Sequence, residues 1–225
     1  MNDSYRPQGF HFLPPVVKHL LIINVIMFFA TQVLKGFGVD LVHYLGLYYP
    51  LADRFFPTQY FTYLFMHGGI GHLFFNMFAL WMFGHTLENY WGSKRFLFYY
   101  LFCGVGAGLI QNIVLTYEIW NFAQLGASEM QIAKYMNRAV TIGASGSVFG
   151  LLLAFGMLFP NMMIYVYFLL PIKAKYFVMI FGVIELLAGI TRSSSNIAHF
   201  AHLGGMLFGI ILILYWRRQR RNDFY

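Results

Sequence analysis

The stretch TIGASGSVFG, residues Thr141–Gly150, places a serine among small residues at the start of a long apolar segment. No charged residue occurs between Val140 and Pro160. An uncharged segment of this length is typical of a helix within a membrane. A helix does not need a hydroxyl group or flexible glycine residues at its beginning in order to cross the membrane. We therefore ask whether Ser145 does more than help this helix to pack.

The whole chain has the composition of a polytopic membrane protein. Of its 225 residues, 59% are hydrophobic and only 10% are charged, whereas a soluble domain carries about 25% charged residues. The net charge of +7 raises the question of a nucleic-acid partner. We expect no nucleic acid, because the basic residues cluster at the ends of apolar segments and in the tail, where they orient a membrane protein.

Six apolar segments are candidates for membrane spans of about 20 residues each. They are Val16–Leu34, Ile70–Leu87, Phe96–Tyr117, Ile142–Phe159, Tyr176–Ile190 and Ile197–Tyr215. The apolar run Met162–Leu170 lies between two prolines, and we expect it to be a connector packed at the membrane interface. The predicted fold class is an all-α membrane protein with six transmembrane helices.

The distribution of Lys and Arg predicts that both termini are cytoplasmic. With this orientation ten basic residues lie on the inner side and five on the outer side, which is the asymmetry typical of cytoplasmic loops. We expect a cytoplasmic segment over residues 1–15, one membrane domain over residues 16–216 and a basic cytoplasmic tail over residues 217–225. The long outer loops are then Lys35–Gly69 and Glu118–Thr141.

Polar residues of three segments fall at a similar depth in the outer half of the membrane. His72 and Asn76 lie in the second segment, Ser145 begins the fourth, and His202 is about 8 Å into the sixth. Polar groups are costly there unless they face the bundle or a hydrated cavity. A serine and an imidazole are the minimal pair for acyl transfer. The other two side chains and the N–H groups that begin the fourth helix can stabilise an oxyanion.

Two glycine pairs predict close packing of the fourth and sixth segments. Gly146 and Gly150 form one G-x-x-x-G pattern, and Gly205 and Gly209 form another. Small residues at this spacing let membrane helices approach each other. His202 shares a helical face with the second pair, so this packing would bring its imidazole to the serine.

Four motifs together resemble those of the rhomboid family of intramembrane serine proteases. They are GASG at Gly143–Gly146, AHLGGMLFG at Ala201–Gly209, HLFFN at His72–Asn76 and GHTLENYWGS at Gly84–Ser93. The resemblance covers most of the chain. It implies a six-transmembrane-helix, rhomboid-like bundle, with residues 16–216 as the peptidase domain.

The resemblance also implies a reaction that needs no cofactor. Ser145 would be the nucleophile and His202 the general base of a dyad, with His72, Asn76 and the Ser145 N–H as the oxyanion hole. The expected substrates are single-span proteins of the lipid bilayer, cut in or beside their transmembrane helices. The active site would open to the outer side of the membrane, which we expect to be a bacterial inner or cell membrane.

Two features differ from the family pattern. The family often has a tyrosine four residues after the serine, where this chain has Phe149. We expect the phenyl ring to stack on His202 without supplying a hydroxyl. The Trp-Arg pair common in the family's first loop is absent, and Arg54 is the candidate to take over part of its role.

Other polar residues have a structural interpretation. Glu88 lies about 24 Å inward of His72 by helical rise. It is therefore too far away to orient His202, and we expect it to hydrogen-bond the inner loop GSKR. Glu185, in the outer half of the fifth segment, is either a neutral structural acid or a third catalytic group. His199, one turn from His202, is the alternative base.

Two other functions are alternatives. A non-catalytic rhomboid-like protein would bind membrane clients without cutting them, although such relatives typically lose the serine or the histidine. His67, His72, His199 and His202 can supply ligands to Zn²⁺, and Glu185 would be the carboxylate at that depth. No H-E-x-x-H pattern and no cysteine accompany these histidines, so we expect no metal.

Overall fold

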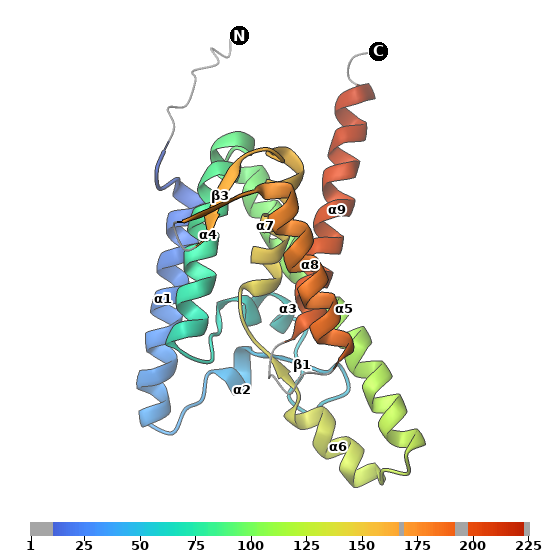
Figure 1. The fold of residues 1–225 in the computed structure, drawn as a ribbon. Coiled ribbons are helices and arrows are strands. Elements are labelled where there is room, and N and C mark those ends of the chain that lie inside the picture. Colours follow the sequence, from blue (N-terminus) through green and yellow to red (C-terminus); the bar gives the residue numbers. More distant parts are fainter. Residues whose placement is uncertain (1–10, 167–168, 192–197, 223–225) are drawn as a thin grey trace.

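The computed structural model describes residues 11–166, 169–191 and 198–222, and these are mainly helical (Figure 1). The longer helices are α1 (Pro15–Gly36), α4 (Ile70–Trp91), α5 (Ser93–Gln124), α7 (Ser145–Leu158), α8 (Ala174–Ile190) and α9 (His199–Asn222). Each of them overlaps one of the six apolar segments of the sequence, with different bounds. Most of the expected cytoplasmic N-terminal segment, the last three residues of the basic tail and the first residue of the sixth segment lie outside the described residues.

The long loop expected after the third segment is mostly helical. α5 continues past Tyr117 to Gln124, and α6 (Glu129–Arg138) follows it. Ser128 begins α6 with a capping box, in which its side chain and that of Gln131 bond each other's backbone N–H groups. The predicted helix end was therefore too early, because residues 118–124, which mix polar and apolar side chains, continue the helix.

Two short strand pairs correct the all-α expectation. β1 (Leu47–Tyr48) pairs antiparallel with β2 (Val140–Thr141). β3 (Met163–Val166) pairs antiparallel with β4 (Leu170–Lys173), so the expected interface connector contains a strand pair. The run MIYV is rich in β-branched and aromatic side chains, which favour strands. Pro171 is compatible with β4 because both strands of a two-stranded sheet are edges.

The first loop is fixed by a buried amide. Its helical turns are α2 (Val42–Leu45), α3 (Gln59–Thr62) and the 3₁₀ turn η1 (Tyr63–Phe65). The Gln59 side chain is fully buried. It accepts a hydrogen bond from the N–H of Tyr48 and donates to the carbonyls of Tyr44 and Arg54, at 3.3, 3.2 and 2.8 Å. Arg54 is itself exposed, so Gln59, and not the Arg54 side chain, ties this loop together.

Glu88 joins the end of α4 to the start of α1. Its side chain is buried and accepts hydrogen bonds from the N–H groups of Val16 and Val17 at 2.9 and 2.8 Å, and from the Ser93 hydroxyl at 2.6 Å. The first N–H groups of a helix have no partner within the helix, and a carboxylate there is favoured by the helix dipole. The hydrogen bond from Ser93 is the expected contact with the GSKR loop. The other two hydrogen bonds come from the start of α1.

α7 is the central helix of the bundle. It contacts α4, α5, α8 and α9, and most of its side chains are buried. α1 begins and α9 ends at one end of the bundle, whereas α2 and α6 lie towards the other (Figure 1). The first turns of α7 and α9 lie between these ends, in the interior of the molecule.

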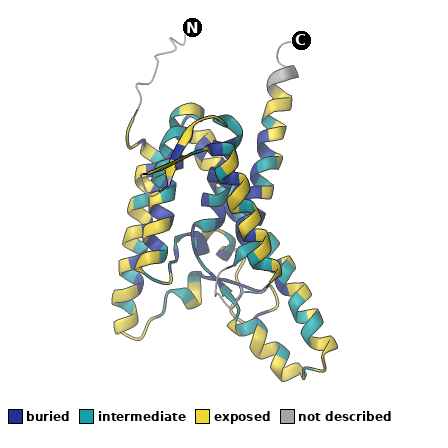
Figure 2. Cartoon of the chain, in the orientation of Figure 1, coloured by how far each residue is buried: buried dark blue, intermediate teal, exposed yellow. Residues whose placement is uncertain are grey.

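The outer faces of the bundle are exposed (Figure 2), and many of the exposed side chains are large and apolar. They include Ile22, Ile26 and Phe29 on α1, and Met179, Val183 and Leu187 on α8. Contiguous apolar surface of this kind is covered by lipid or a partner in a stable protein. Among the described helices α1, α5 and residues His199–Gln219 of α9 are long and apolar enough to cross a membrane, and α7 is apolar but shorter. The chain is therefore a membrane protein.

Candidate active site

A hydroxyl of α7 meets an imidazole of α9 inside the bundle. The distance from Ser145 Oγ to His202 Nε2 is 2.8 Å, which is a hydrogen bond. Ser145 is the first residue of α7 and His202 lies in the first turn of α9. His202 is buried. The structure thus brings together two side chains that are 57 residues apart in the chain.

Glycine is required just before the serine. Gly143 has φ of 121°, a backbone conformation that other residues rarely adopt. A Cβ atom there would lie 2.8 Å from the His72 ring and 3.7 Å from Ser145 Oγ. The Gly143 N–H donates to the carbonyl of Tyr63 at 2.9 Å, so the first loop holds this turn. The missing side chain leaves the space in which His72 lies beside the serine.

Close packing of α7 on α9 sets the position of His202. A Cβ atom on Gly205 would overlap the carbonyl oxygen of Gly146. On Gly150 it would lie 3.2 Å from the carbonyl oxygen of Gly205, and on Gly209 it would overlap the Tyr99 hydroxyl. That hydroxyl donates to the Gly150 carbonyl at 2.9 Å. The two G-x-x-x-G faces therefore lie against each other and against α5.

An aromatic ring covers the imidazole. The rings of Phe149 and His202 are stacked, with centroids 4.3 Å apart and planes at 6°. Phe149 lies one turn after Ser145 on α7, so the helix itself places the ring. The phenyl group supplies the stacking face without a hydroxyl.

His72 and Asn76 lie on α4, across the cavity from α9. The Asn76 amide donates to the carbonyl of His72 at 2.8 Å. The Gly68 N–H makes a long, weak hydrogen bond of 3.4 Å to His72 Nδ1. This favours the tautomer with the proton on Nε2, the ring atom that lies beside Gly143.

A cavity of about 1100 Å³ contains these groups. Ser145, His202, His72 and Asn76 line its polar part. Its apolar part lies between α4 and α8, where Phe75 and Phe78 face Phe177 and Phe181, among other residues. The cavity thus connects the serine with the gap between two helices that face the lipid.

Glu185 and His199 belong to the same cluster. Glu185 Oε2 is 2.8 Å from His202 Nδ1 and also 2.8 Å from His199 Nδ1. The carboxylate and the two histidines hold their potential metal-ligand atoms within 4.8 Å of one another. The sequence offered Glu185 only as one of two possibilities, and His199 as an alternative base. In the structure the serine bonds His202, and His199 bonds the acid.

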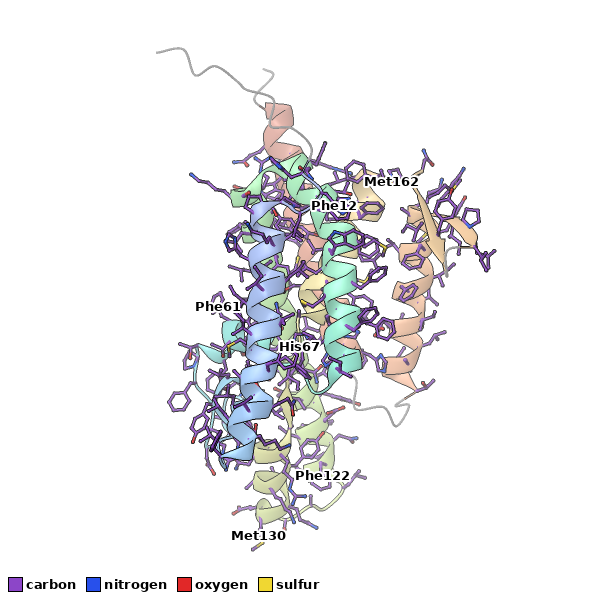
Figure 3. The ribbon with its side chains drawn as sticks, turned by 90° about the vertical axis from the view of Figure 1, so that its left-hand side faces the viewer. Phe12, Phe61, His67, Phe122, Met130 and Met162 are labelled. Carbon is purple, nitrogen blue, oxygen red and sulfur yellow. The ribbon has the colours of Figure 1, made fainter. Side chains whose placement is uncertain are left out.

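His67 lies in the interior beside His72 (Figure 3). It is 2% exposed, and neither ring nitrogen has a hydrogen-bond partner among the described residues. Its ring centroid is 5.0 Å from that of His72. Burial, and then repulsion from His72, lower the pKa of His67 to about 4. The His67 ring is therefore enclosed, and it is not among the residues that line the cavity with His72 and His202.

Two supporting contacts had no signal in the sequence. The Tyr63 side chain donates to the carbonyl of Gly104 at 2.7 Å, while its own carbonyl holds Gly143. The Ser147 hydroxyl donates to the carbonyl of Tyr100 at 2.7 Å. Both use backbone carbonyls, and a sequence does not show which carbonyl a side chain will reach. A serine two positions after Ser145 was visible, but nothing distinguished it from an ordinary small packing residue.

Fold and site together define a helical membrane protein with a serine–histidine pair at a cavity between its helices. Comparison with protein families agrees with this class: the model of the Rhomboid domain matches residues 56–219. The chain belongs to the rhomboid family. Members of this family are generally intramembrane serine proteases.

Curated relatives include proteins of plants, yeast and bacteria. Rhomboid-like protein 11, chloroplastic, of Arabidopsis thaliana is 30% identical over 193 residues, which are 75% of this chain and 61% of the relative. RHOMBOID-like protein 12, mitochondrial, of the same plant is 29% identical over 72% of this chain and 46% of its own length. Rhomboid protease GluP of Bacillus subtilis is 31% identical over 64% of this chain and 23% of its own length. The chain thus spans less than two thirds of each, and these relatives are not confined to bacteria.

Proposed function

We propose that the chain is a serine endopeptidase that cleaves peptide bonds in or beside transmembrane helices of single-span membrane proteins. The observation that carries this proposal is the 2.8 Å hydrogen bond between Ser145 Oγ and His202 Nε2 in a cavity between the helices. A small residue that only helped helices to pack would not need an imidazole at this distance.

The geometry supports acyl transfer in two halves. Ser145 Oγ attacks the substrate carbonyl while its proton moves to His202 Nε2, which then gives that proton to the leaving amine. A water molecule next attacks the acyl-enzyme, with His202 taking its proton and returning one to Ser145 Oγ. The same two side chains therefore serve both halves, and the enzyme is restored at the end.

The negative oxygen formed in each half would face three donors. The Ser145 N–H lies in the first turn of α7, where N–H groups have no partner within the helix. His72 offers Nε2–H in the tautomer that the Gly68 N–H favours. Asn76 uses one amide hydrogen on the His72 carbonyl and has a second for the cavity. Removal of one such donor costs about 10²–10³ in kcat in other serine hydrolases.

A substrate helix would reach the serine from the lipid. The apolar part of the cavity lies between α4 and α8, so unwound substrate can pass between them. We further propose six spans within one domain of residues 16–216, with both termini on the cytoplasmic side and the cavity opening outward. The alternating directions of the six helices and the common end at which α1 starts and α9 finishes support this topology (Figure 1).

The test is cleavage of a generic single-span substrate in liposomes by the wild type, Ser145→Ala and Ser147→Ala. Ser147 is the matched control, because it lies on the same helix turn and bonds a carbonyl of α5. We expect cleavage and fluorophosphonate labelling in the wild type and the control, and neither in Ser145→Ala. Mass spectrometry of the products locates the cut site. Equal cleavage by wild type and Ser145→Ala would refute the proposal. Substrate binding without cleavage by any variant would favour a non-catalytic client-binding protein.

A further inference from the structure

Glu185 lies on the opposite side of His202 from the serine. Its Oε2 is 2.8 Å from His202 Nδ1, while His202 Nε2 is 2.8 Å from Ser145 Oγ. The imidazole thus joins a hydroxyl of α7 to a carboxylate of α8. We propose that Glu185 is a positioning residue that holds His202 in the tautomer and orientation of a general base. This inference rests on the proposed protease function and adds an acid to the expected dyad.

The shared carboxylate oxygen indicates where the protons lie. His199 Nδ1 is also 2.8 Å from Glu185 Oε2. An ionised carboxylate accepts hydrogen bonds and donates none, so both histidines would carry their proton on Nδ1. A protonated acid has one O–H and cannot donate to two ring nitrogens at once. A neutral His202 with Nδ1–H has a free lone pair on Nε2, and this is the atom that must take the Ser145 proton.

Burial makes this arrangement effective. The side chains of His202 and Glu185 are 10% and 11% exposed. A carboxylate in such a place is costly unless it is hydrogen-bonded, and the two imidazole N–H groups meet that need. When His202 takes the serine proton it becomes positive, and the nearby negative charge stabilises it most strongly where water is scarce. The Nδ1 proton stays in place, because only the Nε2 proton travels between serine and leaving amine.

Together with Phe149, Glu185 fixes the ring in two directions. Phe149 covers the face of the imidazole with planes at 6°. Glu185 binds its Nδ1 edge. In a dyad without an acid, only the hydrogen bond to the serine would restrain rotation of the imidazole in its own plane. The acid comes from α8, a different helix from those of the serine and the histidine, so α8 becomes part of the catalytic apparatus.

A divalent cation is the competing explanation of the cluster, since these three side chains can act as ligands. In that case a chelator would abolish activity and Zn²⁺ would restore it, which would overturn our proposal. Activity that is unchanged by a chelator supports the hydrogen-bonded arrangement. The kinetic and spectroscopic tests below use the full chain without added metal.

The kinetic test compares Glu185→Gln, Glu185→Asp and Glu88→Gln in liposomes. We expect Glu185→Gln to lower kcat about 10²–10⁴-fold with KM changed less than about threefold. Glu185→Asp should have a kcat at least about tenfold higher than that of Glu185→Gln. Glu88→Gln is the matched control, a second buried carboxylate that binds N–H groups far from His202, and it should leave kcat per folded molecule unchanged.

A second measurement does not depend on proteolysis. ¹⁵N-histidine spectra, assigned with His202→Asn, report which ring nitrogen of His202 carries the proton. We expect Nδ1–H and a bare Nε2 in the wild type, and loss of that single tautomer in Glu185→Gln. An Nε2–H tautomer in the wild type, or an unchanged kcat in Glu185→Gln, would overturn the proposal. Equal cleavage by Ser145→Ala and the wild type would instead refute the protease function, while the spectra would still decide the tautomer.

Discussion

Phe149 and His202 lie face to face, with ring centroids 4.3 Å apart and planes at 6°. This contact leaves the edge of the imidazole free for Ser145 and Glu185 while restricting tilt of the ring. Stacked rings contribute about 0.5–1.5 kcal/mol beyond the area they bury. The contact is therefore strong enough to affect a rate and too weak to hold the fold by itself.

Replacement of Phe149 by leucine should lower kcat about 2- to 10-fold, because the imidazole gains freedom to tilt away from Ser145 Oγ. Phe149→Tyr should remain close to the wild type, since it keeps the ring face. Steady-state cleavage in liposomes measures both. Phe155→Leu, on the same helix but with its ring tilted against that of Phe83, should reduce thermal stability without changing kcat. A Phe149→Leu enzyme with wild-type kcat would show that stacking has no catalytic role.

Replacement of Gly143 by alanine should reduce kcat at least about 100-fold. The new Cβ would lie 2.8 Å from the His72 ring, so one oxyanion donor would be displaced. The positive φ of 121° adds a backbone cost of about 1–2 kcal/mol. The cleavage rate measures the effect of the displaced oxyanion donor, and the melting temperature in detergent measures the backbone cost. Gly36→Ala is the control, because a Cβ there has no atom within 4 Å, and a matching loss in this control would contradict the explanation.

Replacement of Gly205 by alanine should force α9 away from α7, because its Cβ would overlap the Gly146 carbonyl. Overpacking of this kind costs about 1–3 kcal/mol, and it should also slow fluorophosphonate labelling of Ser145. Gly182→Ala provides the comparison, since its Cβ would meet only the flexible end of Met206 at 3.6 Å. Labelling of Gly205→Ala at the wild-type rate would mean that this glycine contact does not set the position of His202.

Replacement of Glu88 by alanine should lower the free energy of unfolding by about 3 kcal/mol. It would leave the N–H groups of Val16 and Val17 without their carboxylate in a buried place, and each unpaired buried group costs about 1–3 kcal/mol. Thermal unfolding in detergent measures the loss. Asn89→Ala, which removes a more exposed side chain of the same helix, should cost less than about 1 kcal/mol. Phosphonate labelling per folded molecule should not change in either variant.

The positions of the long helices could be predicted because each apolar segment is uniform in composition. The predicted bounds were wrong at two places. Glu118 begins a stretch of mixed polar and apolar residues that continues α5, and Ile142 precedes a turn set by strand pairing and by Gly143. Six apolar segments do not establish six spans. α7 has only 14 residues and lies in the centre of the bundle, so its neighbours and not lipid surround it.

The site could be predicted as far as glycine spacing and depth determine it. Gly146 and Gly205 specify which helix faces meet, and this explains why Ser145 and His202 could be paired from sequence. Glu185 could not be placed, because α8 carries no comparable glycine pattern and its rotation depends on three-dimensional packing. His67 was considered a metal ligand for the same reason: a sequence shows a histidine near the membrane surface but not its enclosure.

The buried His67 ring should make folding stability depend on pH. Burial, and then the neighbouring His72, lower the pKa of His67 to about 4, below the ordinary histidine value of about 6.5. Between these values the unfolded chain binds a proton that the folded chain does not. The stabilisation is therefore complete above about pH 6.5 and is lost as pH falls towards 4, by up to about 3 kcal/mol. Denaturant unfolding in detergent at a series of pH values measures this slope. His67→Phe removes the titrating ring and should flatten the slope, whereas His43→Phe, at the exposed surface, should keep it. A slope that persists in His67→Phe would assign the effect to other groups.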